Sequence, residues 1–311
     1  MINSFSDLTL ELAVKKGRAS IENDKRYKRK LSELSLIDDY LFGLFVQETS
    51  NEEIFKSMIE CMLGVKIKEI HIKQKQHEIS AEPDFQGIRL DAFFQGDDKT
   101  LYNIEVQTSS KGNLAKRMRY YQSLIDREQM PSGEYDYSRL PKTIIIFVTD
   151  FDPFKKSLYR YTFRNVCAED SSLELNDESI KVVLNTKGQN GKGVNTELIE
   201  LLKYFRSSTR ETADESESLL VKTIEEKLGP IRNSPKFGGD YMSYQEKIYI
   251  ERMEAKEEGI EIGEKRGREK GKEEGIEIGE KRGKQEERIK LEKRLRELGA
   301  SEEMIRAAMS N

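Results

Sequence analysis

Two segments with alternating apolar residues, separated by a polar turn, limit the folds open to this chain. IRLDAFF at 88–94 and LYNIEVQ at 101–107 each place their apolar side chains on one face of a strand. The GDDKT sequence between them is a good hairpin turn, so we expect an antiparallel hairpin. The residues left on the opposite face are Arg89, Asp91, Asn103, Glu105 and Gln107.

Burial of the apolar face predicts the register of this hairpin. If Asp91 lies opposite Glu105 or Gln107, the apolar faces of both strands stay together. A shift by one residue would set Asp91 against the apolar face. Two carboxylates and an amide therefore converge on the polar side of an otherwise apolar hairpin.

The order of an acidic residue, a hairpin and then E-x-Q resembles the core of the PD-(D/E)xK nucleases. More closely, the segments IDDYLFGLF, RLDAFF, YNIEVQ, RMRYYQSL and TIIIFVTDF look like the PD-(D/E)xK nuclease family transposases, also called recombination-promoting nucleases. The resemblance spans about residues 35 to 155. It implies an α/β fold with a restriction-endonuclease-like core, in which helices flank a four-stranded mixed sheet. It also implies Mg²⁺-dependent hydrolysis of a DNA phosphodiester.

The resemblance gives individual residues expected roles. Asp91 and Glu105 would be metal ligands, and the Val106 carbonyl would complete the inner shell. Asp39 matches the acidic position of the first helix, in the sequence DYLF. Gln107 stands where the superfamily's usual motif has lysine. The residues that match the helix behind the site are Arg117, Tyr121 and Gln122.

These residue types suit phosphodiester hydrolysis. The reaction needs the phosphate charge neutralised and a water made nucleophilic, and hard oxygen ligands suit Mg²⁺, with Mn²⁺ as an alternative. A lysine at the last motif position would help to orient and deprotonate the water. Gln107 can orient a water by hydrogen bonds, but it brings no charge and cannot act as a base. The metal would then have to contribute more of the activation.

Each candidate also has a simpler interpretation. Asp91 and Glu105 could be solvated residues on the wet face of the hairpin. Asp39 could be a first-turn acid favoured by the helix dipole, and its neighbour Asp38 could be confused with it. Pro83-Asp84 spells the literal PD but precedes the strand, so we interpret it as a loop.

Helical and strand periodicities predict the flanking elements. Apolar spacing indicates a helix capped by Ser35 and a second helix ended by Gly64. VKIKEIHIK alternates like a strand, with a bulge or break near Lys68-Glu69. Further expected elements are an amphipathic helix capped by Asn113, a buried central strand at TIIIFVTDF, a weaker strand at KVVLNT and a short helix at 196–206.

The C-terminal region contains a strict repeat. KEEGIEIGEKRG occurs at 256–267 and again at 272–283, and glycine recurs every four residues from Gly259 to Gly283. Seven glycines would cost a helix about 7 kcal/mol relative to alanine, whereas each i,i+4 charge pair returns only about 0.2–0.5 kcal/mol. Close packing of another helix would explain the stripe, and its spacing favours a right-handed crossing. We therefore expect a homo-oligomer, with a solitary charged helix as the alternative.

Composition sets further limits. Charged residues make up 35% of the chain, and the mean hydropathy is -0.72. No apolar run of about 18 residues exists, so we expect no membrane span. The start, MINSFSDLTLELAVKKGR, does not have the pattern of a secretory signal, so we expect a cytoplasmic protein with its two cysteines as reduced core thiols. Two histidines provide no zinc spacing.

The charge distribution leaves DNA binding open. The formal net charge is -4, which neither supports nor excludes DNA. The basic run at 25–30 could be a DNA-contacting arm, although a solvated basic segment is the favoured interpretation. The expected organisation is an N-terminal segment (1–34), a nuclease-like domain (35–190), a helical connector (191–240) and a charged glycine-repeat helical tail (241–311).

Three functions remain. The first is a metal-dependent DNA endonuclease, a Mg²⁺-dependent deoxyribonuclease linked to mobile elements or DNA recombination and acting as an oligomer. The second is a catalytically weak nuclease fold that serves as a DNA-binding or assembly module, which Gln107 and the long repeat favour. The third is a structural coiled assembly protein, and the converging carboxylates argue against it.

Overall fold

The computed structural model describes residues 34–49, 52–79, 88–110, 113–299 and 301–309. Of these, the residues up to Tyr244 form one compact unit, and those from Gln245 onward belong to a second. The basic run at 25–30, the Pro83-Asp84 pair and nearly all of the N-terminal segment lie outside the described residues.

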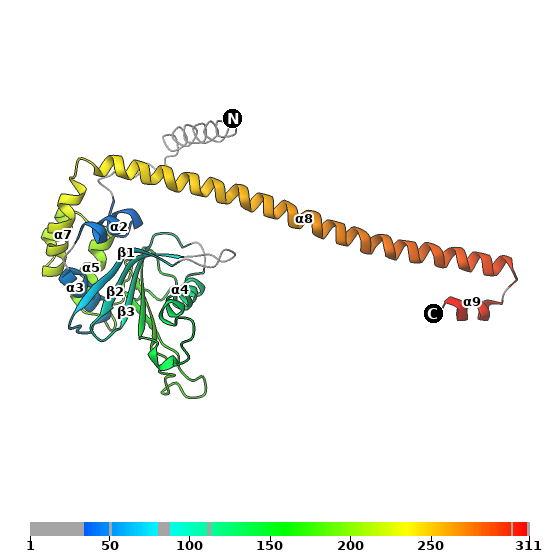
Figure 1. Ribbon diagram of the computed structural model, residues 1–311, viewed down its shortest axis with the longest axis horizontal. Helices are drawn as coiled ribbons and strands as arrows, with labels where there is room; N and C mark the ends of the chain where they lie inside the picture. Colours follow the sequence, from blue (N-terminus) through cyan, green and yellow to red (C-terminus); the bar gives the residue numbers. More distant parts are fainter. Residues whose placement is uncertain (1–33, 50–51, 80–87, 111–112, 300, 310–311) are drawn as a thin grey trace. The chain divides into compact units, whose positions relative to one another are not determined.

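A mixed sheet forms the centre of the first unit (Figure 1). In the described residues it has six strands in the order β1-β2-β3-β4-β6-β5, where the resemblance implied four. β1, β2 and β3 are antiparallel, β3, β4 and β6 are parallel, and β5 is an antiparallel edge strand. The strands are β1 (Ile70–Ile79), β2 (Ile88–Gly96), β3 (Leu101–Gln107), β4 (Thr143–Thr149), β5 (Arg160–Phe163) and β6 (Ser179–Asn185).

Helices cover both faces of this sheet, as expected for an α/β fold (Figure 1). Helix α4 lies on one face, and α2, α3, α5 and α7 lie on the other. The helices of the first unit are α2 (Asp39–Glu48), α3 (Glu52–Leu63), α4 (Leu114–Gln129), α5 (Thr196–Arg206), α6 (Arg210–Glu215) and α7 (Leu219–Arg232). The long charged helix α8 (Phe237–Glu297) begins in this unit, and α9 (Glu302–Met309) follows it in sequence.

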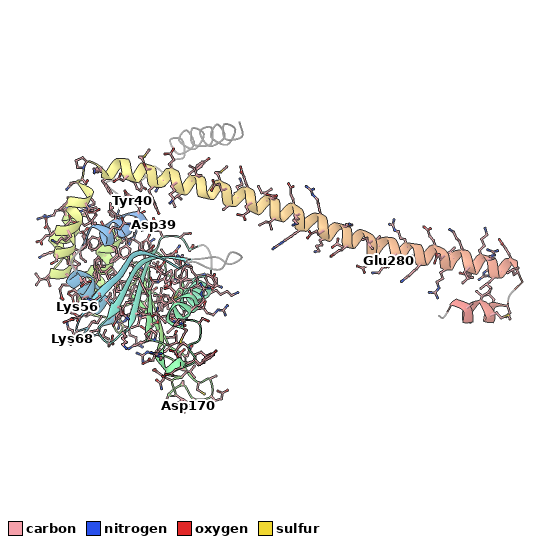
Figure 2. All side chains as sticks on the ribbon, in the orientation of Figure 1. Asp39, Tyr40, Lys56, Lys68, Asp170 and Glu280 are labelled. Atoms are coloured by element: carbon pink, nitrogen blue, oxygen red, sulfur yellow. The ribbon has the colours of Figure 1, made fainter. Side chains whose placement is uncertain are left out.

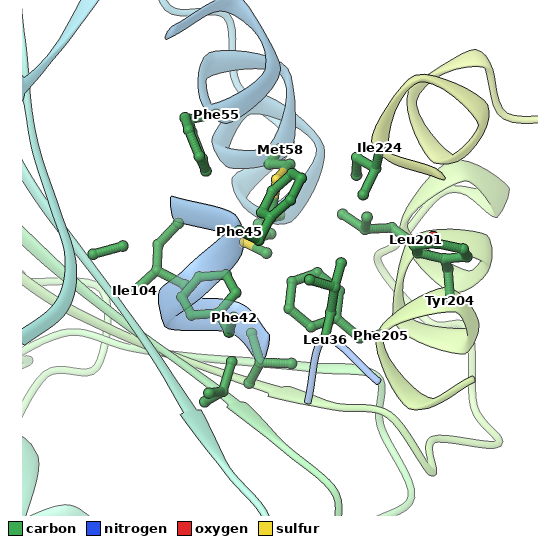
Figure 3. Packing of buried hydrophobic residues seen from close by; sticks show 14 of the residues in the cluster. Leu36, Phe42, Phe45, Phe55, Met58, Ile104, Leu201, Tyr204, Phe205 and Ile224 are labelled. Carbon is green, nitrogen blue, oxygen red and sulfur yellow. The ribbon is translucent and has the colours of Figure 1, made fainter. Parts of the chain in front are cut away.

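The larger core lies between the sheet and the helices of the second face (Figure 3). Full burial of such a Phe or Leu side chain contributes about 1.5–3 kcal/mol. Helices α5 and α7 belong to the range that we assigned to a connector, yet they supply part of this core. Buried members labelled in the figure include Phe42, Phe45, Phe55, Met58, Ile104, Leu201, Phe205 and Ile224.

Several expected elements are confirmed. Every residue of β4 is buried, and β4 lies between β3 and β6 near the middle of the sheet. The Asn113 side chain caps α4 by accepting a hydrogen bond from the Lys116 N–H, 3.0 Å away. Gly64 ends α3 with a φ of 71°, in the left-handed region that suits glycine.

Two predicted boundaries are wrong. Helix α2 begins at Asp39 with Asp38 as its N-cap, because Ser35 instead starts a turn in which its carbonyl accepts from the Asp38 N–H. Strand β1 begins at Ile70, and its bulge lies between Ile72 and Gln74.

The reason for the second error is a contact with α3. The Ile67 N–H donates to the Glu60 side chain over 2.8 Å, so this stretch bonds to a helix before the strand begins. The predicted bulge or break near Lys68-Glu69 is therefore a break, because Lys68 forms a bend and the strand starts only at Ile70. Cys61 is buried as expected, but Cys167 lies half-buried in the loop after β5, where its Sγ donates to Glu169.

Aromatic side chains join the first turns of α8 to α2. The ring of Tyr40 lies 6.0 Å from that of Phe237, 5.1 Å from Tyr241 and 4.8 Å from Tyr244, measured between centroids. The start of α8 is thus part of the first unit's packing.

From residue 253 to residue 291, α8 is exposed. Apart from the adjoining residues and backbone of α8 itself, no described atom lies within 4 Å of the position that a Cβ would take at any glycine from Gly259 to Gly283. The repeat isoleucines Ile260 and Ile276 are 52% and 55% exposed. Side chains such as Glu280 project from the helix (Figure 2). Packing of a second helix on the glycine stripe stays a prediction. In the part of the chain that the structure describes, no helix has the length and apolar character needed to cross a membrane.

Candidate active site

The two candidate carboxylates meet where β2 and β3 stop pairing. The β2–β3 ladder ends at Ala92 opposite Ile104, and this register sets Asp91 opposite Glu105 as expected. The Asp91 N–H donates to Glu105 Oε1 over 3.1 Å. The Val106 N–H donates to Asp91 Oδ2 over 3.2 Å. Each side chain therefore takes the place of a ladder carbonyl and links the two strands at their point of separation.

The apolar face of β2 divides at this point, contrary to the prediction of a single face. Ala92 and Phe94 contribute to the core beneath α2 and α3, whereas Ile88 and Leu90 contribute to the cluster beneath α4. The division coincides with the end of pairing to β3. Asp91 stands between the two pairs of residues.

Glu105 is buried, so the interpretation of a solvated carboxylate is wrong for this residue. Its side chain is 1% exposed, whereas Asp91 is half-buried. Burial, and then the Asp91 carboxylate, raise the pKa of Glu105 well above its usual range. Arg117 and the hydrogen bonds from Asp91 and Asn103 oppose this rise only in part. The surroundings of Glu105 thus disfavour its ionised form.

Arg117 from α4 connects the polar groups of this site. Its Nη2 donates to Glu105 Oε2 over 3.4 Å, and its Nη1 donates to the Gln107 side-chain carbonyl. Its Nε and Nη2 both donate to the Tyr121 hydroxyl, at 3.1 and 2.8 Å. The guanidinium also lies 5.1 Å from the centroid of the Tyr121 ring and 5.2 Å from that of Phe147. These contacts hold the cation beside the carboxylates.

Gln107 is held at both ends of its amide. Its Oε1 accepts from Arg117, and its Nε2 donates to the Ser109 carbonyl over 2.8 Å. Burial, and then the nearby charge of Glu105, raise the pKa of Tyr121 to about 12, so its hydroxyl stays protonated at neutral pH. Gln107 and Tyr121 therefore both act in the site as neutral hydrogen-bonding groups.

Two other sequence candidates lie apart from this network. Asp39 is the first residue of α2 and accepts from the Tyr40 N–H and from the Tyr244 hydroxyl, at 2.8 and 2.9 Å. Figure 2 labels Asp39 and Tyr40 together on this helix. Among the described residues, no group of three His, Cys, Asp or Glu side chains could hold a metal ion, so Asp39 does not complete such a group with Asp91 and Glu105. Gln122 donates to Asp126.

Sequence reasoning missed two residues of the site. Asn103 is fully buried and donates from Nδ2 to Glu105 Oε1 over 3.2 Å, and Phe147 contacts Arg117. The position of Asn103, two residues before Glu105 on the same strand face, could have indicated its role. Phe147 lies in a run that is apolar on both faces, which gives no such signal.

Comparison with known families decides the relationship. A family model described as PD-(D/E)XK nuclease family transposase matches residues 36–226, more than half of the chain. This chain belongs to that family. Comparison with curated proteins and with solved structures gave no match.

The match of the PD-(D/E)XK nuclease family transposase model extends beyond the segments that suggested it. It begins just before α2, includes the Asp91–Glu105 pair and ends within α7. Helix α5, which packs in the same core as the sheet, lies inside the match. The glycine-repeat part of α8 lies outside it.

Proposed function

We propose that this protein is a divalent-metal-dependent DNA endonuclease linked to mobile elements or DNA recombination. The observation that carries the proposal is the Asp91–Glu105 pair at the separation of β2 and β3. One carboxylate of the pair is buried beside the charge of the other, an arrangement that a cation would stabilise. Membership of the PD-(D/E)XK nuclease family transposases supports the same reaction class.

The donor atoms fit a hard divalent ion. Asp91 and Glu105 would hold Mg²⁺ or Mn²⁺ with the carbonyl of Val106, whose own N–H already bonds Asp91. Such an ion, when bound, supplies a Lewis acid that neutralises phosphate charge. Asn103 and Arg117 keep the Glu105 carboxylate oriented, and the packing of Arg117 on two rings limits its movement.

Gln107 would help to position the attacking water. It cannot remove a proton, and its amide must exchange one present partner, Arg117 or the Ser109 carbonyl, to contact a water. This engagement of Gln107 favours a second candidate function, a catalytically weak nuclease fold that serves as a DNA-binding or assembly module. We assign homo-oligomerisation to the 241–311 tail in both cases, which suits the cutting of two strands.

Nicking of supercoiled plasmid tests the proposal. We expect wild-type protein to nick with Mg²⁺ or Mn²⁺, and Asp91→Ala and Glu105→Ala to abolish nicking without unfolding the protein. Glu254→Ala, on the exposed part of α8, is the matched control and should nick like wild type. Circular dichroism confirms that each variant is folded. Retained nicking in both site variants would sink the endonuclease proposal.

DNA binding separates the second function from the first. A weak or inactive nuclease fold predicts no nicking by folded wild-type protein, while removal of either carboxylate keeps or raises DNA affinity because a negative charge is lost. Deletion of 242–311 would then abolish function. Fluorescence anisotropy with a labelled duplex measures that affinity.

A further inference from the structure

A cavity of about 460 Å³ lies beside the carboxylate pair. Residues around the first turn of α4 form one wall, and the loop that follows β4 forms the other. Gln107 and Arg117, which bond each other, both line it, and Arg117 also donates to Glu105. Cavities of about 600 and 570 Å³ lie among the helices of the other sheet face, and neither is lined by these residues.

The lining of this cavity combines a cation with apolar surface. Lys155 is exposed, and Phe151 and Phe154 are partly buried apolar walls. The Phe154 ring lies 4.8 Å from that of Tyr161 and 5.0 Å from that of Phe163, measured between centroids. The volume lies within the range of about 300–1,000 Å³ typical of small-ligand sites. A ligand with an anionic group and a flat apolar part fits this surface.

The one acid among the described lining residues is Asp152, and its carboxylate faces the loop backbone. Oδ1 accepts from the N–H groups of Phe154 and Lys155, each over 3.0 Å, and from the Tyr161 hydroxyl over 2.8 Å. Oδ2 accepts from the Ser157 N–H over 2.7 Å. These bonds occupy the carboxylate within the loop and reduce its competition with an anionic ligand.

The same bonds fix the loop in an uncommon shape. Lys155 and Ser157 have φ values of 55° and 58°, in the left-handed region that residues other than glycine rarely adopt. Asp152 bonds to the N–H of both residues and so stabilises this conformation. The loop therefore presents Lys155 to the cavity from a fixed backbone.

We propose that this cavity is the subsite for the nucleotide next to the scissile phosphate. Lys155 pairs with the phosphate of that nucleotide, and Phe151 and Phe154 contact its sugar and base. The assignment rests on the proposed nuclease function, because Gln107 and Arg117 place the cavity beside the Asp91–Glu105 pair. Asp152 acts as a positioning residue that holds the loop.

Binding of thymidine 5'-monophosphate to the full-length protein without metal tests the subsite. Lys155→Gly removes the amine and leaves a residue that adopts positive φ readily, so the loop keeps its shape and thermal stability should not fall. We expect about fivefold weaker binding, the loss of one ion pair. Lys156→Ala is the matched control, since Lys156 is its exposed neighbour outside the cavity lining, and should bind like wild type.

The outcomes separate this subsite from the catalytic proposal. Equal weakening by Lys156→Ala, or inorganic phosphate binding as tightly as the nucleotide, would overturn the subsite. Nucleotide binding that depends on Lys155 supports the subsite even when wild-type protein fails to nick plasmid. Nicking that depends on Asp91 without any nucleotide binding at this loop would overturn the subsite and leave the nuclease function standing. Isothermal titration calorimetry measures each affinity.

Discussion

Glu105 lies in surroundings that oppose its charge. It is 1% exposed and faces the Asp91 carboxylate, and its partner Arg117 is 3.4 Å away. Burial of an ionised carboxylate is unfavourable unless a cation and hydrogen bonds compensate. The structure compensates in part, so a divalent cation between the two carboxylates would stabilise the folded protein.

Replacement of Glu105 by glutamine tests this balance. The amide keeps the size of the side chain, and its oxygen can still accept from the Asp91 N–H. We expect Mg²⁺ to stabilise wild-type protein by about 2.7 kcal/mol at a hundredfold excess over its dissociation constant, and to stabilise Glu105→Gln little. Thermal unfolding with and without Mg²⁺ measures both values. An equal gain in the variant would place the ion elsewhere.

We expect Asp152 to make a pH-dependent contribution to the stability of the folded protein. Burial raises the pKa of Asp152, but hydrogen bonds from Ser157, Tyr161 and Phe154 lower it by more. The net effect is a pKa below the usual value. A depressed pKa in the folded state stabilises the protein above the unfolded pKa of about 3.9, and this stabilisation is lost as pH falls through the folded value.

We therefore expect Asp152→Asn to lower the free energy of unfolding by about 1–3 kcal/mol at pH 7. The difference from wild type should shrink below about pH 4, where the unfolded state begins to protonate this carboxylate, and should vanish as the pH falls through the lower folded pKa. Urea unfolding at a series of pH values measures the difference. If the difference in free energy of unfolding between wild type and variant stays constant down to pH 3, the charge of Asp152 contributes nothing to stability.

At the scale of elements, α4 carries the cation of the site on a capped helix. Asn113 caps α4, and Asn195 caps α5 in the same way, each side chain accepting an N–H bond over 3.0 Å. Arg117 lies in the first turns of α4, whereas the buried residues of α5 pack in the core on the other face of the sheet. The two caps are thus a natural pair for comparison.

Substitution of each cap by alanine should cost about 1 kcal/mol of stability. Asn113→Ala should also reduce plasmid nicking, because Arg117 loses a rigid support, while Asn195→Ala should leave nicking unchanged. Urea unfolding and nicking assays well below the melting temperature measure the two effects. Equal nicking by both variants would show that the Asn113 cap is not needed to hold Arg117 in place.

At the scale of the whole molecule, α8 combines an unfavourable composition with exposure. Its glycines have open space around them in the described chain, and it carries i,i+4 pairs such as Arg268–Glu264 and Lys281–Glu277. Such exposed pairs contribute about 0.2–0.5 kcal/mol each. A solitary helix of this kind is marginal, which is why we assign the glycine stripe to contact with a second copy.

Alanine at Gly259, Gly263, Gly267 and Gly271 tests that contact. Each substitution should favour the helix by about 1 kcal/mol, so helicity measured by circular dichroism should rise. The added methyl groups would prevent close approach of a partner helix, so assembly measured by light scattering at tens of micromolar should fall. Wild-type protein that is monomeric at that concentration would contradict the assignment.

Local pattern was enough to predict much of the fold. The hairpin register, the buried strand β4, the Asn113 cap and the Gly64 terminus all follow from alternation, turn residues and caps within a few positions. These features depend on neighbours along the chain, whose geometry is nearly the same in any fold. The meeting of Asp91 and Glu105 is predictable for this reason.

Other features depend on packing between distant segments. The bond from Ile67 to Glu60, the division of the β2 face and the contacts of Arg117 with Phe147 could not be read from periodicity. Nor could the burial of Glu105, since an alternating strand shows which face a residue occupies but not what covers that face. Only the tertiary structure, in which Arg117 of α4 contacts this carboxylate, decides that it is removed from water, because desolvation depends on every segment packed around a group.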